Sequence, residues 1–225
     1  MNEYPLIDLA TPLARSPQTK DPWLRLAGRD LRRELTATAT PAAWSLSTFA
    51  GRFGEISADH ATASLTLVFR LVLEAQKQGE PVGWISGRGS TFFPPDASDV
   101  GIDLSALAVI WAPETLAAAR AAEHLLRSGS FGLVIMDLGP KARLPLHAHA
   151  RLVGQARQHS TALLCITEKE SNRPSVSSLV SLRAHTGRTA KKEDRFRCEA
   201  RILKDKRSGP GWGHVEICRG PDGLR

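Results

Sequence analysis

The chain has 225 residues and a formal net charge of +7, with 42% hydrophobic and 24% charged residues. This length and composition are typical of one globular domain with a full core. No apolar run is long enough to span a membrane and residues 1–19 lack a signal-peptide pattern, which predicts a cytoplasmic protein. Cys165, Cys198 and Cys218 show no metal-ligand spacing, so we expect free thiols and no metal site.

The N-terminal part of the chain differs from the rest. Residues 1–22 are rich in proline and polar side chains, and we expect a loose arm. Residues 21–35 predict an amphipathic helix, because apolar side chains recur on one face with arginines around it. We favour packing of this helix on the domain; docking onto a partner is the alternative. The predicted units are an N-terminal arm and helix over 1–41, a core domain over 42–218 and a tail over 219–225.

Strand and helix patterns alternate through the core. The strands are near-continuous apolar runs, which predicts a parallel sheet covered by helices on both faces. Residues 195–203 and 214–218 alternate in polarity instead, which predicts half-exposed antiparallel strands. The predicted fold class is therefore α/β, with a central, mostly parallel sheet and antiparallel C-terminal strands. The expected strands are 53–57, 82–86, 107–111, 131–137 and 162–166, and the expected helices are 64–78, 114–127 and 146–159.

One segment stands between the first strand and the first helix, where a phosphate-binding loop belongs. Such a loop reads G-x-x-x-x-G-K-[ST], because glycines let backbone N–H groups close around phosphate and the lysine reaches the β/γ-phosphates. Here the two glycine positions are Ala58 and Ala63, the lysine is Ser64 and the hydroxyl residue is Leu65. Asp137 ends an apolar strand where a Mg²⁺-binding carboxylate would lie, and we interpret it as a relic. The sequence therefore predicts no ATP cofactor, no catalytic residues and no enzyme.

Positive charge gathers in the second part of the chain. Residues 1–138 carry 12 basic and 15 acidic side chains, whereas residues 139–225 carry 18 and 8. Clustered positive charge is typical of polyanion binding, so we expect weak, salt-sensitive binding of single-stranded DNA or an acidic partner surface. A solvated hairpin over residues 183–197 would explain part of this positive charge equally well. The candidate residues lie in two loops, in a turn and on a late strand: Lys141, Arg143, Lys169, Arg173, Arg188, Lys191, Lys192, Lys204 and Lys206.

A set of short segments resembles the core of bacterial RecA in order and spacing. Two of them, 139–143 and 169–173, match the positions of the DNA-contacting loops of RecA but are shorter. Lys204 and Lys206 match positions that reach a neighbour's nucleotide. The resemblance implies a RecA-like core. The matching segments are 51–56, 74–79, 82–85, 101–104, 121–129, 131–137, 162–168 and 201–206.

The departures from RecA point to one subfamily. The position of the catalytic Glu falls near Arg88, and that of the γ-phosphate sensor at Glu168. A RecA-like chain without an ATP site resembles the ImuA family of damage-induced mutagenesis proteins. This implies a non-catalytic adaptor in SOS-induced error-prone translesion synthesis, whose partners are RecA and an ImuB-like polymerase subunit. The alternatives are a SulA-like inhibitor of the cell-division GTPase FtsZ and an active RecA-type DNA-dependent ATPase.

Overall fold

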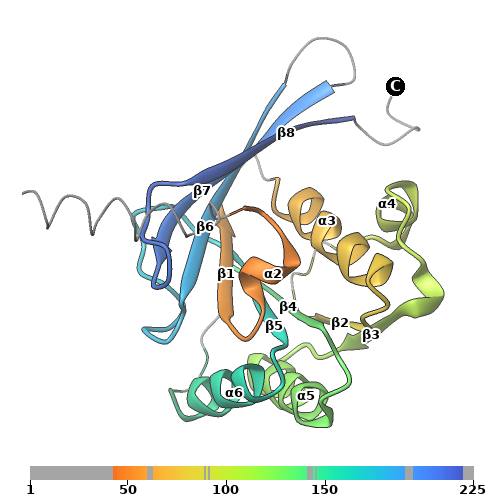
Figure 1. Ribbon diagram of the computed structural model, residues 1–225, viewed down its shortest axis with the longest axis vertical. Helices are drawn as coiled ribbons and strands as arrows, with labels where there is room; N and C mark the ends of the chain where they lie inside the picture. The colour runs from red at the N-terminus through yellow and green to blue at the C-terminus, as the bar shows by residue number, and fades with distance from the viewer. Residues whose placement is uncertain are drawn as a thin grey trace, which may run out of the picture. The chain divides into compact units, whose positions relative to one another are not determined.

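The chain forms one eight-stranded mixed sheet with the strand order β3-β2-β4-β5-β1-β6-β7-β8 (Figure 1). The computed structural model describes residues 43–59, 63–88, 90, 92–140, 144, 146–190 and 195–219. The predicted N-terminal arm and helix and the predicted tail beyond residue 219 lie outside this part. The strands are β1 Phe53–Ala58, β2 Val82–Ser86, β3 Leu107–Trp111, β4 Leu133–Gly139, β5 Ala162–Glu168, β6 Leu182–Ala190, β7 Arg195–Asp205 and β8 Gly213–Arg219.

The sheet is parallel from β3 to β6 and antiparallel from β6 to β8. Strand β1 lies between β5 and β6, with Phe53 opposite Leu163 and Gly54 opposite Leu182. Strand β2 lies between β3 and β4. Strands β6, β7 and β8 pair in antiparallel succession. The predicted mixed sheet is therefore confirmed.

The helices lie on both faces of the sheet, as predicted. Helix α3 lies on one face, and α5 and α6 pack side by side on the other (Figure 1). Helix α5 ends where Gly129 adopts a left-handed conformation with φ 68°, which L side chains rarely adopt. The helices are α2 Leu46–Phe49, α3 Ser64–Lys77, α4 Pro94–Asp99, α5 Thr115–Ser128 and α6 Leu146–Gln158, with the 3₁₀ turn η1 at Leu104–Ala106.

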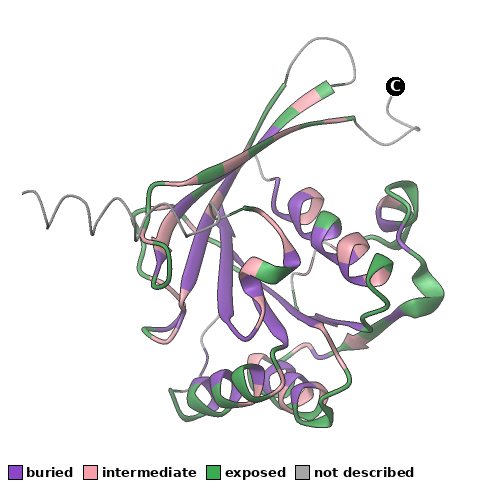
Figure 2. Ribbon diagram, in the orientation of Figure 1, coloured by how far each residue is buried: buried purple, intermediate pink, exposed green. Residues whose placement is uncertain are grey.

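Two apolar layers enclose the sheet, because side chains along each strand point alternately to its two faces. Trp84 and Ile135 join the layer under α3, whereas the neighbouring Ile85 and Met136 join the layer under α5 and α6. Figure 2 shows the central strands buried along their length and exposed residues on the outer sides of the helices. The central strands β2, β4 and β5 are therefore buried on both faces, which is why they appear as nearly continuous apolar runs in the sequence.

The C-terminal strands differ from expectation in two respects. Strand β6 runs through Leu182–Ala190, so Arg188 lies on a strand and not in the predicted turn. Strand β7 alternates as expected. In β8, however, Val215 and Ile217 face outward and are about half exposed, while Glu216 lies on the side of the core. The reason is the register, because the residue of β7 opposite Glu216 is the buried Cys198.

Candidate functional site

The segment that corresponds to a phosphate-binding loop connects β1 to α3 at the carboxyl ends of the parallel strands. Ala58 is the last residue of β1 and is buried, and Ala63 is fully buried immediately before α3. The Ser64 side chain is buried, with its Oγ 2.7 Å from Thr186 Oγ1 of β6. A short hydroxyl therefore stands at the lysine position of the motif and contacts the sheet. Leu65 follows it and is partly buried.

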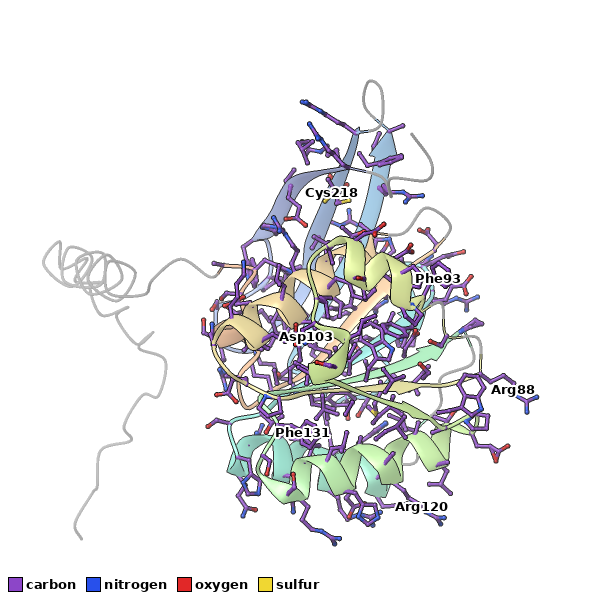
Figure 3. All side chains as sticks on the ribbon, turned by 90° about the vertical axis from the view of Figure 1, so that its right-hand side faces the viewer. Arg88, Phe93, Asp103, Arg120, Phe131 and Cys218 are labelled. Carbon is purple, nitrogen blue, oxygen red and sulfur yellow. The ribbon has the colours of Figure 1, made fainter. Side chains whose placement is uncertain are left out.

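Asp137 lies near the end of β4 and is held by the loop that follows β2. Ser90 Oγ donates to Asp137 Oδ2 at 2.6 Å, and the Gly87 N–H donates to the Asp137 carbonyl oxygen at 2.8 Å. A Cβ at Gly87 would lie 2.8 Å from that carbonyl oxygen, so this close approach requires glycine. Arg88 is exposed and lies at the outer end of this loop (Figure 3). No pattern in the sequence indicates Ser90 as the contact of Asp137.

A fully buried carboxylate, Glu55 of β1, organises the segment after β5. Lys169 Nζ lies 2.5 Å from Glu55 Oε1, and Thr167 Oγ1 donates to the same oxygen at 3.0 Å. The Val176 N–H donates to Glu55 Oε2 at 3.0 Å, and Arg183 Nε lies 3.9 Å from that oxygen. Glu55 thus links β1 to the end of β5, to the segment after β5 and to β6. Lys169, a predicted DNA contact, is an ion-pair partner of this carboxylate.

Arg183 of β6 also binds the segment after β5. Its guanidinium donates to the backbone carbonyl oxygens of Arg173 and Glu170. Burial lowers the pKa of Arg183, and the charge of Glu55 opposes this shift. A charged residue inside a buried strand was the signal in the sequence for this cluster, because such residues are buried only when they are paired.

A second buried ion pair joins Arg52, just before β1, to Asp205 at the end of β7, between Lys204 and Lys206 in the chain. Arg52 Nη2 and Asp205 Oδ1 are 2.5 Å apart, and Trp212 Nε1 donates to Asp205 Oδ2 at 3.1 Å. Burial raises the pKa of Asp205, but the hydrogen bonds that it accepts, first among them the one from Arg52, leave it below the ordinary value. The ammonium groups of both lysines donate to the Ser178 carbonyl oxygen, at 3.4 and 3.0 Å. They therefore also contact the segment that Glu55 organises.

The remaining basic candidates are dispersed. The Arg173 side chain is exposed in the segment after β5. The Arg188 guanidinium lies 4.8 Å from the centre of the Phe196 ring, a cation–π contact. The structure thus brings Lys169, Lys204 and Lys206 around one segment and leaves Arg188 apart from them. Four candidates lie outside the described residues: Lys141, Arg143, Lys191 and Lys192.

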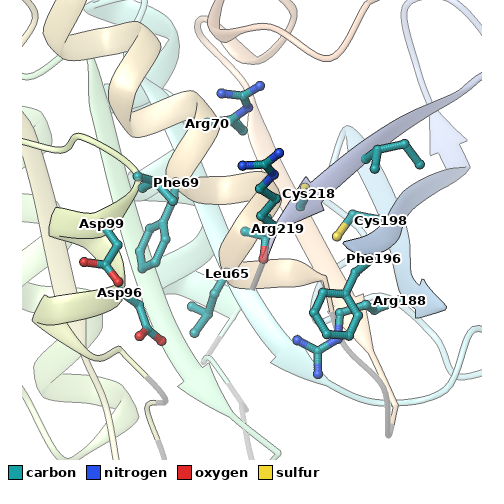
Figure 4. Close-up of a pocket in the computed structure, with 13 residues that line it drawn as sticks. Leu65, Phe69, Arg70, Asp96, Asp99, Arg188, Phe196, Cys198, Cys218 and Arg219 are labelled. Atoms are coloured by element: carbon teal, nitrogen blue, oxygen red, sulfur yellow. The ribbon is translucent and has the colours of Figure 1, made fainter. Parts of the chain in front are cut away.

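A cleft of about 460 Å³ opens beside the start of α3 (Figure 4). It lies between α3, α4 and the strands β6, β7 and β8. Leu65 lines it, so the cleft adjoins the loop described above. No local sequence pattern indicates this cleft, because its residues come from five elements that are distant in the chain.

The described residues contain no cluster of His, Cys, Asp and Glu side chains that is able to hold a metal ion. Cys165 is fully buried and burial raises the pKa of its thiol well above the ordinary value. His147 is exposed on α6, whereas His149 is buried and its pKa is lowered by burial. None of the helices in the described part is both long and apolar enough to cross a membrane.

Comparison with known proteins shows similarity to RecA proteins of several bacteria. No protein-family model matches the chain. It is 33% identical over 122 residues to protein RecA of Chlorobium limicola, covering 52% of this chain and 35% of that protein. The chain is RecA-like. Protein RecA of Chlorobaculum tepidum is 31% identical over 136 residues, covering 58% and 39%, and that of Fusobacterium nucleatum is 31% identical over 122 residues, covering 52% and 32%.

The RecA-like relationship agrees with the fold, a mostly parallel sheet with antiparallel C-terminal strands and helices on both faces. The chain spans 35%, 39% and 32% of the length of these three curated relatives.

Proposed function

We propose that this chain is a non-catalytic RecA-like adaptor in SOS-induced error-prone translesion DNA synthesis, and that it binds RecA and an ImuB-like polymerase subunit. The observation that carries the proposal is the RecA-like sheet with Ser64 at the lysine position of the phosphate loop. The Ser64 hydroxyl is buried and 2.7 Å from Thr186 Oγ1. A RecA-like chain without the phosphate-binding cation acts by binding, not by hydrolysis.

Four features, two of them in the phosphate loop, support the absence of ATP chemistry. Phosphoryl transfer depends on positive charge and oriented backbone N–H groups around the phosphates. Ala63 is fully buried, so its Cβ occupies space at a position where the motif needs glycine. Ser64 supplies no charge, and the exposed Arg88 lies near the position of the catalytic Glu and cannot act as a general base. Asp137 accepts a hydrogen bond from Ser90 and has a structural contact independent of Mg²⁺.

Exposed apolar side chains at an edge of the sheet support a role in protein binding. Strand β3 is an edge strand, and its Trp111 and Val109 side chains are 66% and 51% exposed. Leu104 and Leu116, on neighbouring segments, are also exposed. An unpaired strand edge with exposed apolar side chains is a surface that a partner covers. This edge is our candidate for the contact with RecA or the ImuB-like subunit.

Direct DNA contact has a smaller part in the proposal. Lys169 pairs with Glu55, and Lys204 and Lys206 donate to Ser178, so their positions are determined by the protein itself. Their free N–H groups and the exposed Arg173 suffice for weak contacts with phosphate. We therefore propose at most weak, sequence-independent binding of single-stranded DNA.

The test combines nucleotide titration with partner binding. The full chain is titrated with ATP and Mg²⁺, with and without single-stranded DNA, and is then used to capture purified RecA and purified ImuB-like subunit. We expect no ATP binding and capture of both partners. Hydrolysis that depends on single-stranded DNA would establish the ATPase alternative. Failure to capture either partner, together with filamentous cells on expression, would favour the SulA-like alternative.

A further inference from the structure

The cleft beside α3 has an apolar floor. Leu65 and Phe69 of α3 and Phe196 of β7 contribute to it, together with the thiols of Cys198 and Cys218 (Figure 4). Burial raises the pKa of both thiols; Cys198 is buried and Cys218 is partly exposed. An aliphatic or aromatic side chain is the group that such a floor accommodates.

The two walls of the cleft carry opposite charges. Asp96 and Asp99 of α4 line one side, and Arg188 of β6 and Arg219 of β8 line the other (Figure 4). None of these four side chains forms an ion pair with another described residue. Asp99, Arg188 and Arg219 are exposed and Asp96 is half-buried. The cleft therefore presents two carboxylates opposite two guanidinium groups, with apolar surface between them. The Arg188 guanidinium also lies over the Phe196 ring.

This arrangement selects among classes of ligand. A polyanion such as nucleotide triphosphate or DNA meets the arginine wall favourably but is repelled by Asp96 and Asp99. A simple cation is attracted by Asp96 and Asp99 but is repelled by the arginine wall. Leu65, at the hydroxyl position of the phosphate loop, adds apolar surface to the cleft. A ligand with both charges and an apolar group between them matches all three surfaces.

We propose that this cleft binds a short peptide segment of a protein partner, which places an apolar side chain on the floor, a basic side chain against Asp96 and Asp99, and an acidic side chain against Arg188 and Arg219. A volume of about 460 Å³ accommodates one or two such anchor side chains. The proposal rests on the adaptor function only in that the protein acts through protein partners. It adds the chemistry of one partner segment to that function.

The test begins with a random twelve-residue peptide library displayed on phage and selected on the full-length chain. Selected peptides are then measured by fluorescence anisotropy. We expect them to share an apolar residue between a basic and an acidic one. Asp96→Lys combined with Asp99→Lys should weaken binding about tenfold, because two favourable exposed charge pairs become repulsive. Peptides with the basic residue changed to acidic should regain binding to that variant.

Arg219→Glu should weaken the original peptides several-fold and favour those with the acidic residue changed to basic. The matched control is Arg120→Glu, a charge reversal of an exposed arginine on α5 away from the cleft (Figure 3). It should leave the affinity unchanged, and thermal melting should show that every variant is folded.

Two results of the peptide measurements would overturn the inference. One is selection of peptides whose affinity is insensitive to the changes at Asp96, Asp99 and Arg219. The other is displacement of the peptides by ATP or by a fifteen-nucleotide oligo(dT) at similar concentration, which would assign the cleft to nucleotide or DNA. If the cleft variants still capture RecA and the ImuB-like subunit as wild type does, the cleft proposal fails while the adaptor function stands. If the wild-type chain itself captures neither RecA nor the ImuB-like subunit, the proposed adaptor function is refuted instead.

Discussion

Replacing Glu55 with glutamine removes the charge of this side chain but hardly changes its size. This substitution should destabilise the domain strongly. The carboxylate is fully buried and faces Lys169 at 2.5 Å and Arg183 at 3.9 Å. In the Glu55→Gln variant the acceptor for Thr167 remains. The negative charge is lost, however, and the amide –NH₂ takes the place of an oxygen that accepts from the Val176 N–H. Two cationic groups then lie in or near the core without a counter-charge.

The expected loss of stability follows from this geometry. Removing one partner of a buried ion pair costs about 3–5 kcal/mol. The lower end applies here because the Lys169 side chain is 19% exposed and water compensates part of its charge. We therefore expect Glu55→Gln to lower the free energy of unfolding by about 3 kcal/mol. For a domain of this size that corresponds to a decrease in Tm of about 6–12 °C.

A double-mutant cycle with Lys169→Met, measured by urea unfolding, isolates the ion pair. Lys169→Met alone should cost about 1–2 kcal/mol, and the double variant should lose at least about 1 kcal/mol less than the sum of the single losses. The matched control is Glu170→Gln, which neutralises an exposed neighbouring carboxylate and should change stability by less than about 0.5 kcal/mol. Additive losses would mean that Lys169 and Glu55 do not interact in solution, and Lys169 would again be a candidate for DNA contact.

Three other changes test separate parts of the structure. Gly87→Ala should cost about 1–3 kcal/mol in urea unfolding, because the new Cβ would meet the Asp137 carbonyl oxygen at 2.8 Å; Gly154→Ala, with open space around it, is the control, and equal effects would contradict the contact. Burial holds the pKa of His149 below its ordinary value of 6.5. The unfolded state therefore binds more protons below that pH, and stability should fall as the pH decreases from about 7 to 5. His149→Gln should reduce this slope, and an unchanged slope would refute the assignment. Ser64→Lys should destabilise the protein more than Ser64→Ala and should not restore ATP binding in the titration, because the side chain at this position is buried.

The elements of the parallel core were predictable from local sequence patterns. Buried strands such as β2 and β4 are continuous apolar runs, and the strict alternation along β7 predicted which of its side chains face the core. The helix predicted over residues 64–78 is observed as Ser64–Lys77. These predictions succeed because the pattern of burial along one strand or helix has a short period that the neighbouring residues display.

Strand β6 illustrates what local pattern does not reveal. Its residues include Arg183, His185 and Arg188, a composition that predicts a turn or an exposed hairpin. The structure buries Arg183 because β6 lies between β1 and β7 and because Glu55 lies close to its guanidinium. The pairing of two charged residues 128 positions apart is a property of strand order, which no short window of sequence contains.

Local sequence patterns establish the α/β class, the places of most strands and helices, and the substitution of every key residue in the phosphate loop. The folded structure adds where the side chains of Ser64, Glu55 and Lys169 point, which face of β8 is covered, and that α4 and the C-terminal strands enclose a cleft with oppositely charged walls. This division follows from the range of the interactions. Secondary structure follows from neighbours along the chain, whereas ion pairs, register and clefts depend on which distant segments the folded sheet places side by side.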